Sequence, residues 1–195
     1  MQTLILGSSS PFRAELLGKL NLPFDTVSPD IDETPLPNEP ATDLVKRLAE
    51  QKAATIAVQH PNALIIGSDQ VALLNDEIIG KPGNHKTAMA QLQAASGQTV
   101  QFLTGLALLN SQTGQLQSVV EPFEVRFKTL SDRQIEFYLK MEQPYQCAGS
   151  FKSEGFGISL FRQLHGNDPN SLIGLPLIQL ITLLNNEGID VLQAH

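Results

Sequence analysis

The sequence predicts an α/β fold, with a mixed sheet and flanking helices, formed as a single domain over residues 1–195. Strand-like and helix-like segments alternate through the first half of the chain, which is typical of parallel strands joined by helices. Later, two long strand-like segments are joined by a short turn, which predicts an antiparallel pair. The composition agrees, because 195 residues with 42% hydrophobic side chains can bury a sizeable core.

The first expected elements are a strand, a small polar turn and a helix. Residues 3–6 form a short apolar run, and Ser10 and Pro11 suit the N-cap and the first position of a helix over residues 11–20. Arg13 falls on the apolar face of that helix. Backbone N–H groups at such a helix start suit an anion, although an ordinary capped turn explains the same residues.

A second helix is expected from Pro40 to about Gln59. Its apolar stripe includes Leu44 and Leu48, and Lys52 lies near the centre of that stripe. One interpretation is a lysine that lays its stem along apolar surface and extends its ammonium into water. The other is a cation in a polar site, because charges are rarely buried without a partner.

A polar tetrad, residues 67–70, interrupts the next apolar run and contains Asp69. The flanks, residues 63–66 and 71–74, are strand-like, so the tetrad is expected to be a strand end or a bulge that faces a cleft. A simple turn between two strands is the alternative. A carboxylate in such a place could hold a divalent metal or take a proton from water.

Two further charged residues lie in expected loops. Glu33 belongs to the proline-punctuated segment 30–35, whose three carboxylates suit either a solvated loop or a hard-cation site. Lys81 lies in a tight, exposed turn over residues 79–82. Neither position has a chemical role that the residues alone require.

The second half of the chain contains further expected elements. Residues 147–174 are rich in glycine and lack clear periodicity, so we expect a long functional loop there. Turn residues, strand-like runs and a capping box at residues 131–134 predict a hairpin turn at 75–77 leading to 78–79, a helix at 86–96, strands at 99–110 and 115–128, a helix ending near 141, a helix at 175–186 and a last strand at 189–192.

The net charge of −7, from 13 basic and 20 acidic residues, argues against a general nucleic-acid binder but not against a small anionic ligand. The one cysteine, Cys147, excludes a disulfide within the chain, fits a reducing compartment and is interpreted as a small buried hydrophobe. No secretory leader or apolar segment of about 20 residues is seen. We therefore expect a cytoplasmic protein with no membrane partner.

Six short motifs, taken together and in order, resemble the Maf family of nucleoside triphosphate pyrophosphatases. They are SSSPFR (residues 8–13), DETP (32–35), KA (52–53), GSD (67–69), GKP (80–82) and GLP (174–176). The resemblance implies a fold like that of inosine triphosphate pyrophosphatases, with two lobes around a cleft, and a homodimer. It also implies hydrolysis of a nucleotide between its α- and β-phosphates, with a divalent cation such as Mg²⁺ or Mn²⁺.

On this resemblance, the charged and polar residues of the motifs take defined roles. Asp69 is expected to be the general base on the attacking water, and Glu33 and Asp69 are expected to hold the metal. The residues expected to bind the phosphates are Ser8, Ser9, Arg13, Lys52 and Lys81.

Three residues narrow the resemblance to the subgroup that acts on 7-methyl-GTP: Phe12, Gln70 and Glu154. That subgroup usually has tryptophan where this chain has Phe12. Methylation at N7 makes guanine cationic, so an aromatic face and a nearby carboxylate would attract it. Without the family, Phe12 would be interpreted as a core residue and Glu154 as a solvated charge.

Three other functions remain as alternatives. The chain could be a nucleotide-binding regulator of cell division or septum formation, or a Maf pyrophosphatase for canonical nucleotides such as dTTP and UTP. A sugar-phosphate transferase would explain the N-terminal turn but neither Lys52 nor Asp69. The presence of four charged residues favours chemistry, because binding alone would not need a base: Asp69, Glu33, Lys52 and Lys81.

Overall fold

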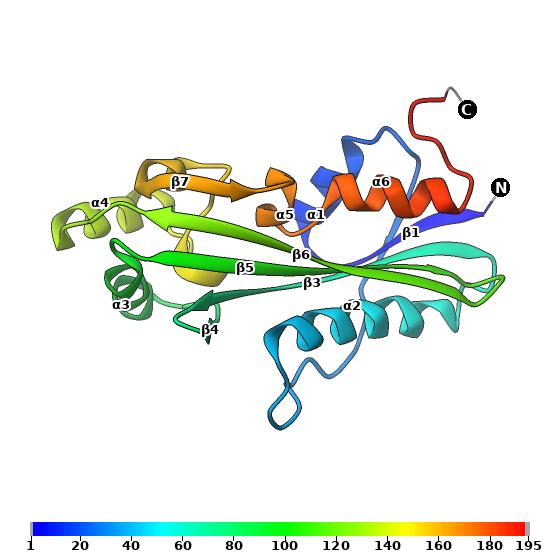
Figure 1. The fold of residues 1–195 in the computed structure, drawn as a ribbon, viewed down its shortest axis with the longest axis horizontal. Helices are drawn as coiled ribbons and strands as arrows, with labels where there is room; N and C mark the ends of the chain where they lie inside the picture. Colours follow the sequence, from blue (N-terminus) through cyan, green and yellow to red (C-terminus); the bar gives the residue numbers. More distant parts are fainter. Residues whose placement is uncertain (1, 194–195) are drawn as a thin grey trace. The chain divides into compact units, whose positions relative to one another are not determined.

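The computed structural model describes residues 2–193 and contains a seven-stranded mixed sheet with helices on both faces (Figure 1). This confirms the predicted fold class. The strands are β1 (Thr3–Gly7), β2 (Asp25–Val27), β3 (Ala63–Leu74), β4 (Glu77–Ile79), β5 (Thr99–Asn110), β6 (Gln115–Phe127) and β7 (Phe161–Gly166). The α-helices are α1 (Pro11–Gly18), α2 (Ala41–Ala57), α3 (His85–Ala95), α4 (Asp132–Glu142), α5 (Pro169–Ile173) and α6 (Leu177–Asn186), and two 3₁₀ helices are η1 (Ala148–Ser150) and η2 (Phe156–Leu160).

The strand order in the sheet is β2-β1-β3-β5-β6-β7, and β4 pairs with β3. β1 is parallel to both β2 and β3, whereas β4 is antiparallel to β3 and β7 is antiparallel to β6. Asn75 and Asp76, both with positive φ, make the turn from β3 to β4, which confirms the predicted hairpin.

The described chain divides into two compact units, in agreement with the two lobes that the resemblance implies. The first contains the described parts of Met1–Gln70, Thr104–Glu121 and Asn170–His195, and the second contains Val71–Leu103 and Pro122–Pro169. The long strands β3, β5 and β6 contribute residues to both units. The single domain over residues 1–195 stays a prediction.

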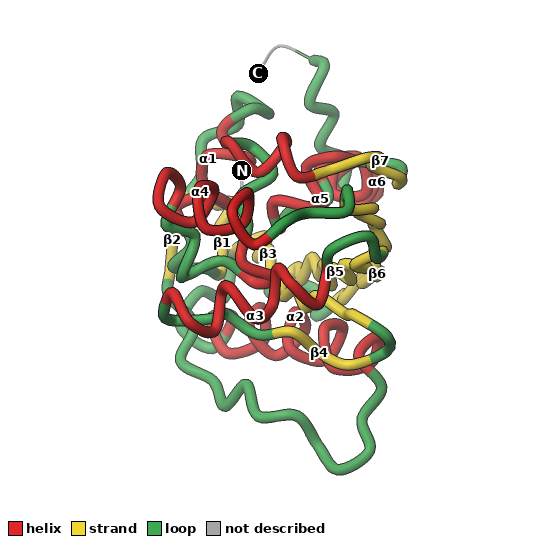
Figure 2. Tube along the Cα trace, turned by 90° about the vertical axis from the view of Figure 1, so that its left-hand side faces the viewer, coloured by secondary structure: helices red, strands yellow, loops and turns green. Residues whose placement is uncertain are grey.

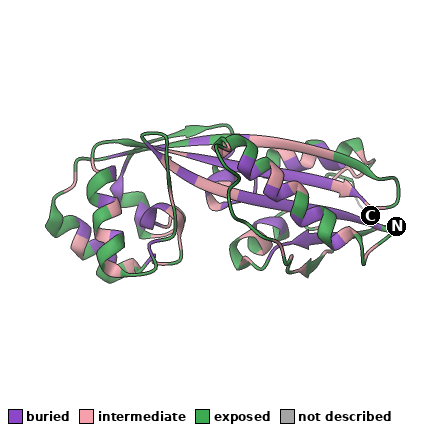
Figure 3. Cartoon of the chain, turned by 90° about the horizontal axis from the view of Figure 1, so that it is seen from below, coloured by how far each residue is buried: buried purple, intermediate pink, exposed green. Residues whose placement is uncertain are grey.

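In the first unit, both faces of β1 and β3 are covered by helices, so alternate strand residues enter two different cores. Leu6, Leu64 and Ile66 pack on the side that also receives side chains from α1 and α6. Ile5 and Ile65 pack on the side of α2. Burial on both faces explains why these strands are nearly continuous apolar runs, and the buried strands between exposed helix faces can be followed in Figure 3.

Helix α2 approaches the sheet very closely because two facing strand positions are glycines. A Cβ atom at Gly67 would lie 2.0 Å from the carbonyl oxygen of Ala49, and one at Gly105 would lie 2.1 Å from that of Val45. Any side chain at either position would force helix and strand apart. This contact brings the middle of α2, including Lys52, onto the polar segment of β3.

The second unit has an aromatic core beside its part of the sheet. Phe151 makes edge-to-face contacts with Phe102, Phe127 and Phe161, at ring-centroid distances of 5.5, 5.4 and 5.0 Å. Such geometry is favoured between aromatic rings. The core is therefore built partly from the segment that was expected to be a loop.

Two secondary-structure predictions for the second half of the chain are wrong. The segment 147–174 contains η1, η2, β7 and α5 rather than a continuous loop. β7 joins the sheet by backbone pairing, and all its residues after Phe161 are exposed. The sequence therefore has no apolar alternation from which this strand could be predicted. No strand forms at residues 189–192. Ile189 and Val191 instead pack against the core that contains Leu6 and Leu64, without pairing to the sheet.

Candidate active site

The polar turn after β1 and the start of α1 are tied together by serine side chains. Ser10 is the N-cap of α1, and its Oγ accepts from the backbone N–H of Arg13 at 3.4 Å. Ser8 is buried, and its Oγ accepts from the N–H of Ser10 and from Nη1 of Arg13. Ser9 is exposed between them. The predicted phosphate-binding turn is therefore a capped helix start with an arginine beside it.

Arg13 is half-buried and is fixed by a backbone carbonyl from the far end of the sequence. Its Nε donates to the carbonyl oxygen of Gly174 at 2.7 Å. Burial lowers the pKa of the Arg13 guanidinium, while the charges of Asp69 and Glu33 act in the opposite direction. The guanidinium stays charged at neutral pH and lies within electrostatic reach of both carboxylates.

Lys52 joins the two predicted acidic residues. Its Nζ lies 2.7 Å from Oδ1 of Asp69 and 2.7 Å from Oε1 of Glu33. The Lys52 and Asp69 side chains are 7% and 13% exposed, whereas that of Glu33 is 60% exposed. The cluster therefore has a buried side, formed by Lys52 and Asp69, and a solvent side formed by Glu33. The alternative of a lysine whose ammonium extends into water is wrong.

Asp69 lies inside the continuous strand β3, neither at a strand end nor in a turn between two strands, so those two predictions are corrected. The carboxylate is tolerated in a buried strand because Lys52 neutralises it. Its Oδ2 atom makes no hydrogen bond to any residue from 2 to 193, so one carboxylate oxygen remains for a proton or a ligand.

Ser68 and Gln70, on either side of Asp69, point to the opposite face of the strand. Ser68 Oγ donates to the Gly174 carbonyl at 2.9 Å, and Gln70 Nε2 donates to the Ser171 carbonyl at 2.7 Å. Alternation along a strand explains the division. Asp69 thus faces Lys52, while its two neighbours hold the segment around α5.

The loop that carries Glu33 is held by Arg47 on α2. Residues 28–40 contain no helix or strand, as expected from their prolines (Figure 2). Arg47 makes two hydrogen bonds to the Glu39 carboxylate, of 2.6 and 2.7 Å, and one of 3.2 Å to the Thr34 carbonyl. The two bonds to the carboxylate lower the pKa of Glu39 to about 2. They also fix the loop next to Glu33.

Glu33 and Asp69 are chemically suited to the divalent cation that the resemblance implies. The described residues include no group of three or more His, Cys, Asp or Glu side chains that could hold a metal. However, the two carboxylates already converge on one cation, the Lys52 ammonium. Magnesium is commonly held by one or two carboxylates together with substrate phosphates, so the donor set fits.

Phe12 and Glu154, two of the predicted specificity residues, both present their side chains to solvent. Phe12 is 37% exposed, so it is not the core residue that its apolar character alone suggested. Glu154 is exposed and accepts a hydrogen bond of 3.3 Å from Ser153 Oγ.

Lys81 and Glu154 both belong to the second unit and act electrostatically on the same thiol, that of Cys147. Burial raises the pKa of Cys147; Lys152 and Lys81 oppose the rise and Glu154 adds to it. The thiol is partly rather than fully buried, which corrects the prediction of a buried residue. Its raised pKa disfavours the reactive thiolate, so Cys147 is unsuited to act as a nucleophile.

Sequence reasoning missed three residues that organise the site: Thr104, Ser171 and Arg47. Gly174 belongs to the GLP motif, but the role of its carbonyl, which accepts from Arg13 and Ser68, was not predicted. Thr104 had a usable signal, because it is a polar residue inside the apolar run of β5 and is completely buried. Ser171 and Arg47 act through tertiary contacts and have no local signal.

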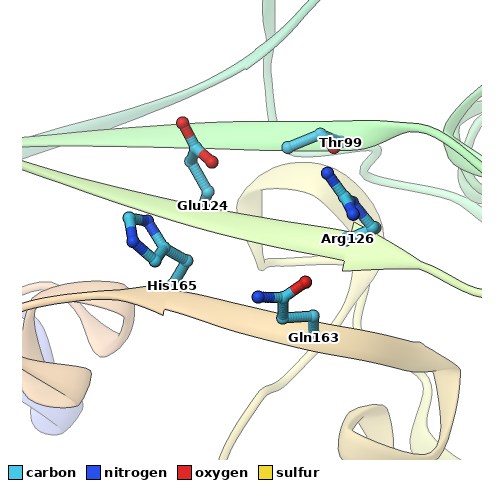
Figure 4. Close-up of a pocket in the computed structure, with 5 residues that line it drawn as sticks. All are labelled: Thr99, Glu124, Arg126, Gln163 and His165. Carbon is cyan, nitrogen blue, oxygen red and sulfur yellow. The ribbon is translucent and has the colours of Figure 1, made fainter.

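A separate hollow of about 210 Å³ lies in the second unit and contains none of the predicted site residues. Figure 4 shows its lining side chains, which come from β5, β6 and β7: Thr99, Glu124, Arg126, Gln163 and His165. Across the β6–β7 ladder, Glu124 pairs in register with His165 and Arg126 with Gln163. The hollow is thus a polar feature of the sheet surface.

Comparisons with known proteins agree with the motifs. The profile of the family described as Maf-like protein matches residues 3–187. A protein of Nitrosococcus oceani named 7-methyl-GTP pyrophosphatase is 60% identical over 190 residues, covering 97% of this chain and 96% of the relative. Proteins with the same name from Alcanivorax borkumensis and Colwellia psychrerythraea are 58% and 55% identical, over 97% and 98% of this chain and 96% of each relative.

Among residues 2–193, no helix is both long enough and apolar enough to span a membrane. The family match extends from β1 to just beyond α6 and includes every element that carries Arg13, Lys52 and Asp69. With relatives above 50% identity along nearly the whole chain, the protein belongs to the Maf family.

Proposed function

We propose that this chain is a hydrolase of acid anhydrides that converts 7-methyl-GTP into 7-methyl-GMP and pyrophosphate. The observation that carries the proposal is the cluster in which Lys52 pairs with both Asp69 and Glu33. Arg13 is close enough to interact electrostatically with both carboxylates. Such a cluster supplies the base and the cations that hydrolysis of a triphosphate requires. The names of the relatives support the same reaction and substrate.

In this reaction, Asp69 accepts a proton from water while the water oxygen attacks phosphorus of the α–β anhydride. The bond between the α-phosphorus and the bridging oxygen breaks, and pyrophosphate leaves. Lys52 fixes Oδ1 of Asp69, so the proton is taken by the carboxylate at a constrained position. Arg13, Lys52, Lys81 and the N–H group at Ser9 bind the phosphates, whereas the N–H group of Ser8 already donates to the Leu6 carbonyl at 3.0 Å. Glu33 and Asp69 would hold a divalent cation such as Mg²⁺, which neutralises phosphate charge.

Substrate choice follows from the charge of the methylated base. GTP and 7-methyl-GTP carry the same triphosphate, but only the methylated guanine is a cation. The exposed ring of Phe12 offers a π face to that cation, and Glu154 offers a carboxylate. A desolvated cation–π contact is worth up to about 2 kcal/mol, which corresponds to about 30-fold in kcat/KM.

Pyrophosphate release measured with both nucleotides tests the proposal. We expect wild-type kcat/KM to be at least tenfold higher for 7-methyl-GTP, and Phe12→Ala and Glu154→Gln to reduce that ratio. Glu15→Gln, an exposed carboxylate on the same helix as Phe12, is the charge control and should leave the ratio unchanged. A wild-type ratio near one would reject the substrate assignment.

Two further outcomes test whether the protein is a hydrolase and whether it requires a metal. Nucleotide binding without pyrophosphate release would favour a binding regulator over a hydrolase. Full activity in excess EDTA would reject the metal requirement. The homodimer and the cytoplasmic location that were expected from the sequence remain predictions.

A further inference from the structure

The amide group of Gln70 lies in a small polar network that includes Thr104 and the backbone of Ser171. Gln70 Nε2 is 2.9 Å from Thr104 Oγ1 and 2.7 Å from the Ser171 carbonyl oxygen. Thr104 Oγ1 is itself 3.0 Å from that carbonyl oxygen. Thr104 has no exposed surface, and Gln70 is half-buried. The network therefore lies on the buried side of the Gln70 amide group.

The direction of each proton in this network follows from the chemistry of the partners. A carbonyl oxygen only accepts, so both Thr104 and Gln70 must donate to Ser171. The hydroxyl has a single hydrogen, which Ser171 takes, so Thr104 must accept from Gln70. Both hydrogens of the Gln70 amide are then used, and this fixes which amide atom is nitrogen and which is oxygen.

The amide oxygen is left as the atom that Gln70 can offer to a ligand. Oε1 makes no hydrogen bond to any residue from 2 to 193. An amide held in this way presents an acceptor and cannot present a donor. It therefore complements a base edge that donates.

We propose that Thr104 is a positioning residue for base selection: it holds Gln70 so that Oε1 accepts from the N1–H or N2–H₂ groups of guanine. The proposal rests on the proposed function and on the expectation, drawn from the resemblance, that Gln70 is one of the residues that select the base. In the same pose, adenine would place an acceptor at N1 and no amine at C2 opposite the Gln70 oxygen, and its one amine, at C6, lies where guanine has its O6 acceptor. A site whose polar groups are left unpaired discriminates strongly against the wrong ligand.

The experiment compares 7-methyl-GTP with 7-methyl-ATP, which share the methyl cation and the triphosphate and differ at the base edge. Thr104→Val keeps the side-chain shape and removes the hydroxyl, whereas Thr104→Ser keeps the hydroxyl. We expect Thr104→Val to lower the ratio of kcat/KM between the two nucleotides at least fivefold, mainly through KM for 7-methyl-GTP. Thr104→Ser should retain the wild-type ratio within twofold.

Gln70→Met provides a second test that does not depend on a buried substitution. It removes the acceptor at a half-buried position and should lower the ratio at least as much as Thr104→Val. Adding Thr104→Val to Gln70→Met should then change the ratio no further. A ratio unchanged by Gln70→Met overturns the proposal even if Thr104→Val fails to fold, and an unchanged ratio in folded Thr104→Val overturns it directly.

Failure here is distinguishable from failure of the proposed function. The latter predicts turnover of 7-methyl-GTP and a preference for it over GTP, which the proposed function assigns to Asp69 and to Phe12 with Glu154. If wild type turns over 7-methyl-GTP with the methyl preference, but neither variant changes discrimination against 7-methyl-ATP, only the role of Thr104 is rejected. If wild type does not hydrolyse 7-methyl-GTP, the function itself is rejected.

Discussion

Replacing Lys52 with Met should destabilise the protein through the carboxylate that it leaves behind. Asp69 is 13% exposed, and its Oδ1 lies 2.7 Å from the ammonium. Breaking a buried ion pair by removing one partner typically costs about 3–5 kcal/mol. Here the cost should fall below that range, at about 2–3 kcal/mol, because Met retains the apolar contacts of the lysine stem. Glu33, at 60% exposure, should add little.

Thermal unfolding of wild type, Lys52→Met, Asp69→Asn and the double variant measures this coupling. For a chain of this size about 2–4 °C corresponds to 1 kcal/mol, so Lys52→Met should lower Tm by roughly 4–12 °C. In the Asp69→Asn background, Lys52→Met should lower Tm much less, because no buried charge is left without a partner. Lys46→Met is the control on the same helix, since Lys46 is 51% exposed and 4.0 Å from Glu50.

Equal effects of Lys52→Met in both backgrounds would refute the ion pair as the source of stability. A decrease in Tm for Lys46→Met as large as that for Lys52→Met would mean that replacing any lysine on α2 destabilises the protein. Either result would remove the physical basis for treating Lys52 and Asp69 as one unit.

Three other expectations follow. Asp69→Asn should reduce pyrophosphate release by about 10²–10⁴-fold with an unchanged far-ultraviolet spectrum, and near-normal turnover would show that another group is the base. Gly174→Ala should cost about 1–3 kcal/mol, since its φ of +123° disfavours a side chain and the new Cβ would lie 3.3 Å from Arg13 Nε; Gly18→Ala, with open space around it, is the control in urea unfolding. The Arg47 hydrogen bonds lower the pKa of Glu39 from 4.5 to about 2, so its stabilisation should be complete above 4.5 and vanish as pH falls towards 2. Glu39→Gln should therefore differ from wild type in urea midpoint at pH 7 and converge with it near pH 2, and a constant difference would contradict this.

Local patterns in the sequence predicted much of the fold. The helical period placed Lys52 on the apolar stripe of α2, and Ser10 and Pro11 marked the start of α1 correctly. Capping and turn residues depend on neighbours within one turn of chain, so they can be read without tertiary contacts. β7 could not be read in this way, because an exposed edge strand is held by backbone pairing and needs no apolar alternation.

The candidate site was predicted as a set of residue types rather than as an arrangement. Asp69 was expected at a strand end, because a carboxylate inside a buried strand is unfavourable unless a cation reaches it. Lys52 is that cation, and it reaches Asp69 only because Gly67 lets α2 lie against the strand. Local sequence therefore indicated which charges were unusual but not which of them were partners.

The sequence by itself determined the family, the helix and strand periods of the first unit, and the charged residues that interrupt its apolar faces. Only the tertiary structure decided that Asp69 faces Lys52 while Ser68 and Gln70 face the carbonyls of Ser171 and Gly174. The physical reason is distance along the chain. A buried polar group is stabilised by whichever partner the packing of helix on sheet brings to it, and those partners lie 17 to 106 residues away.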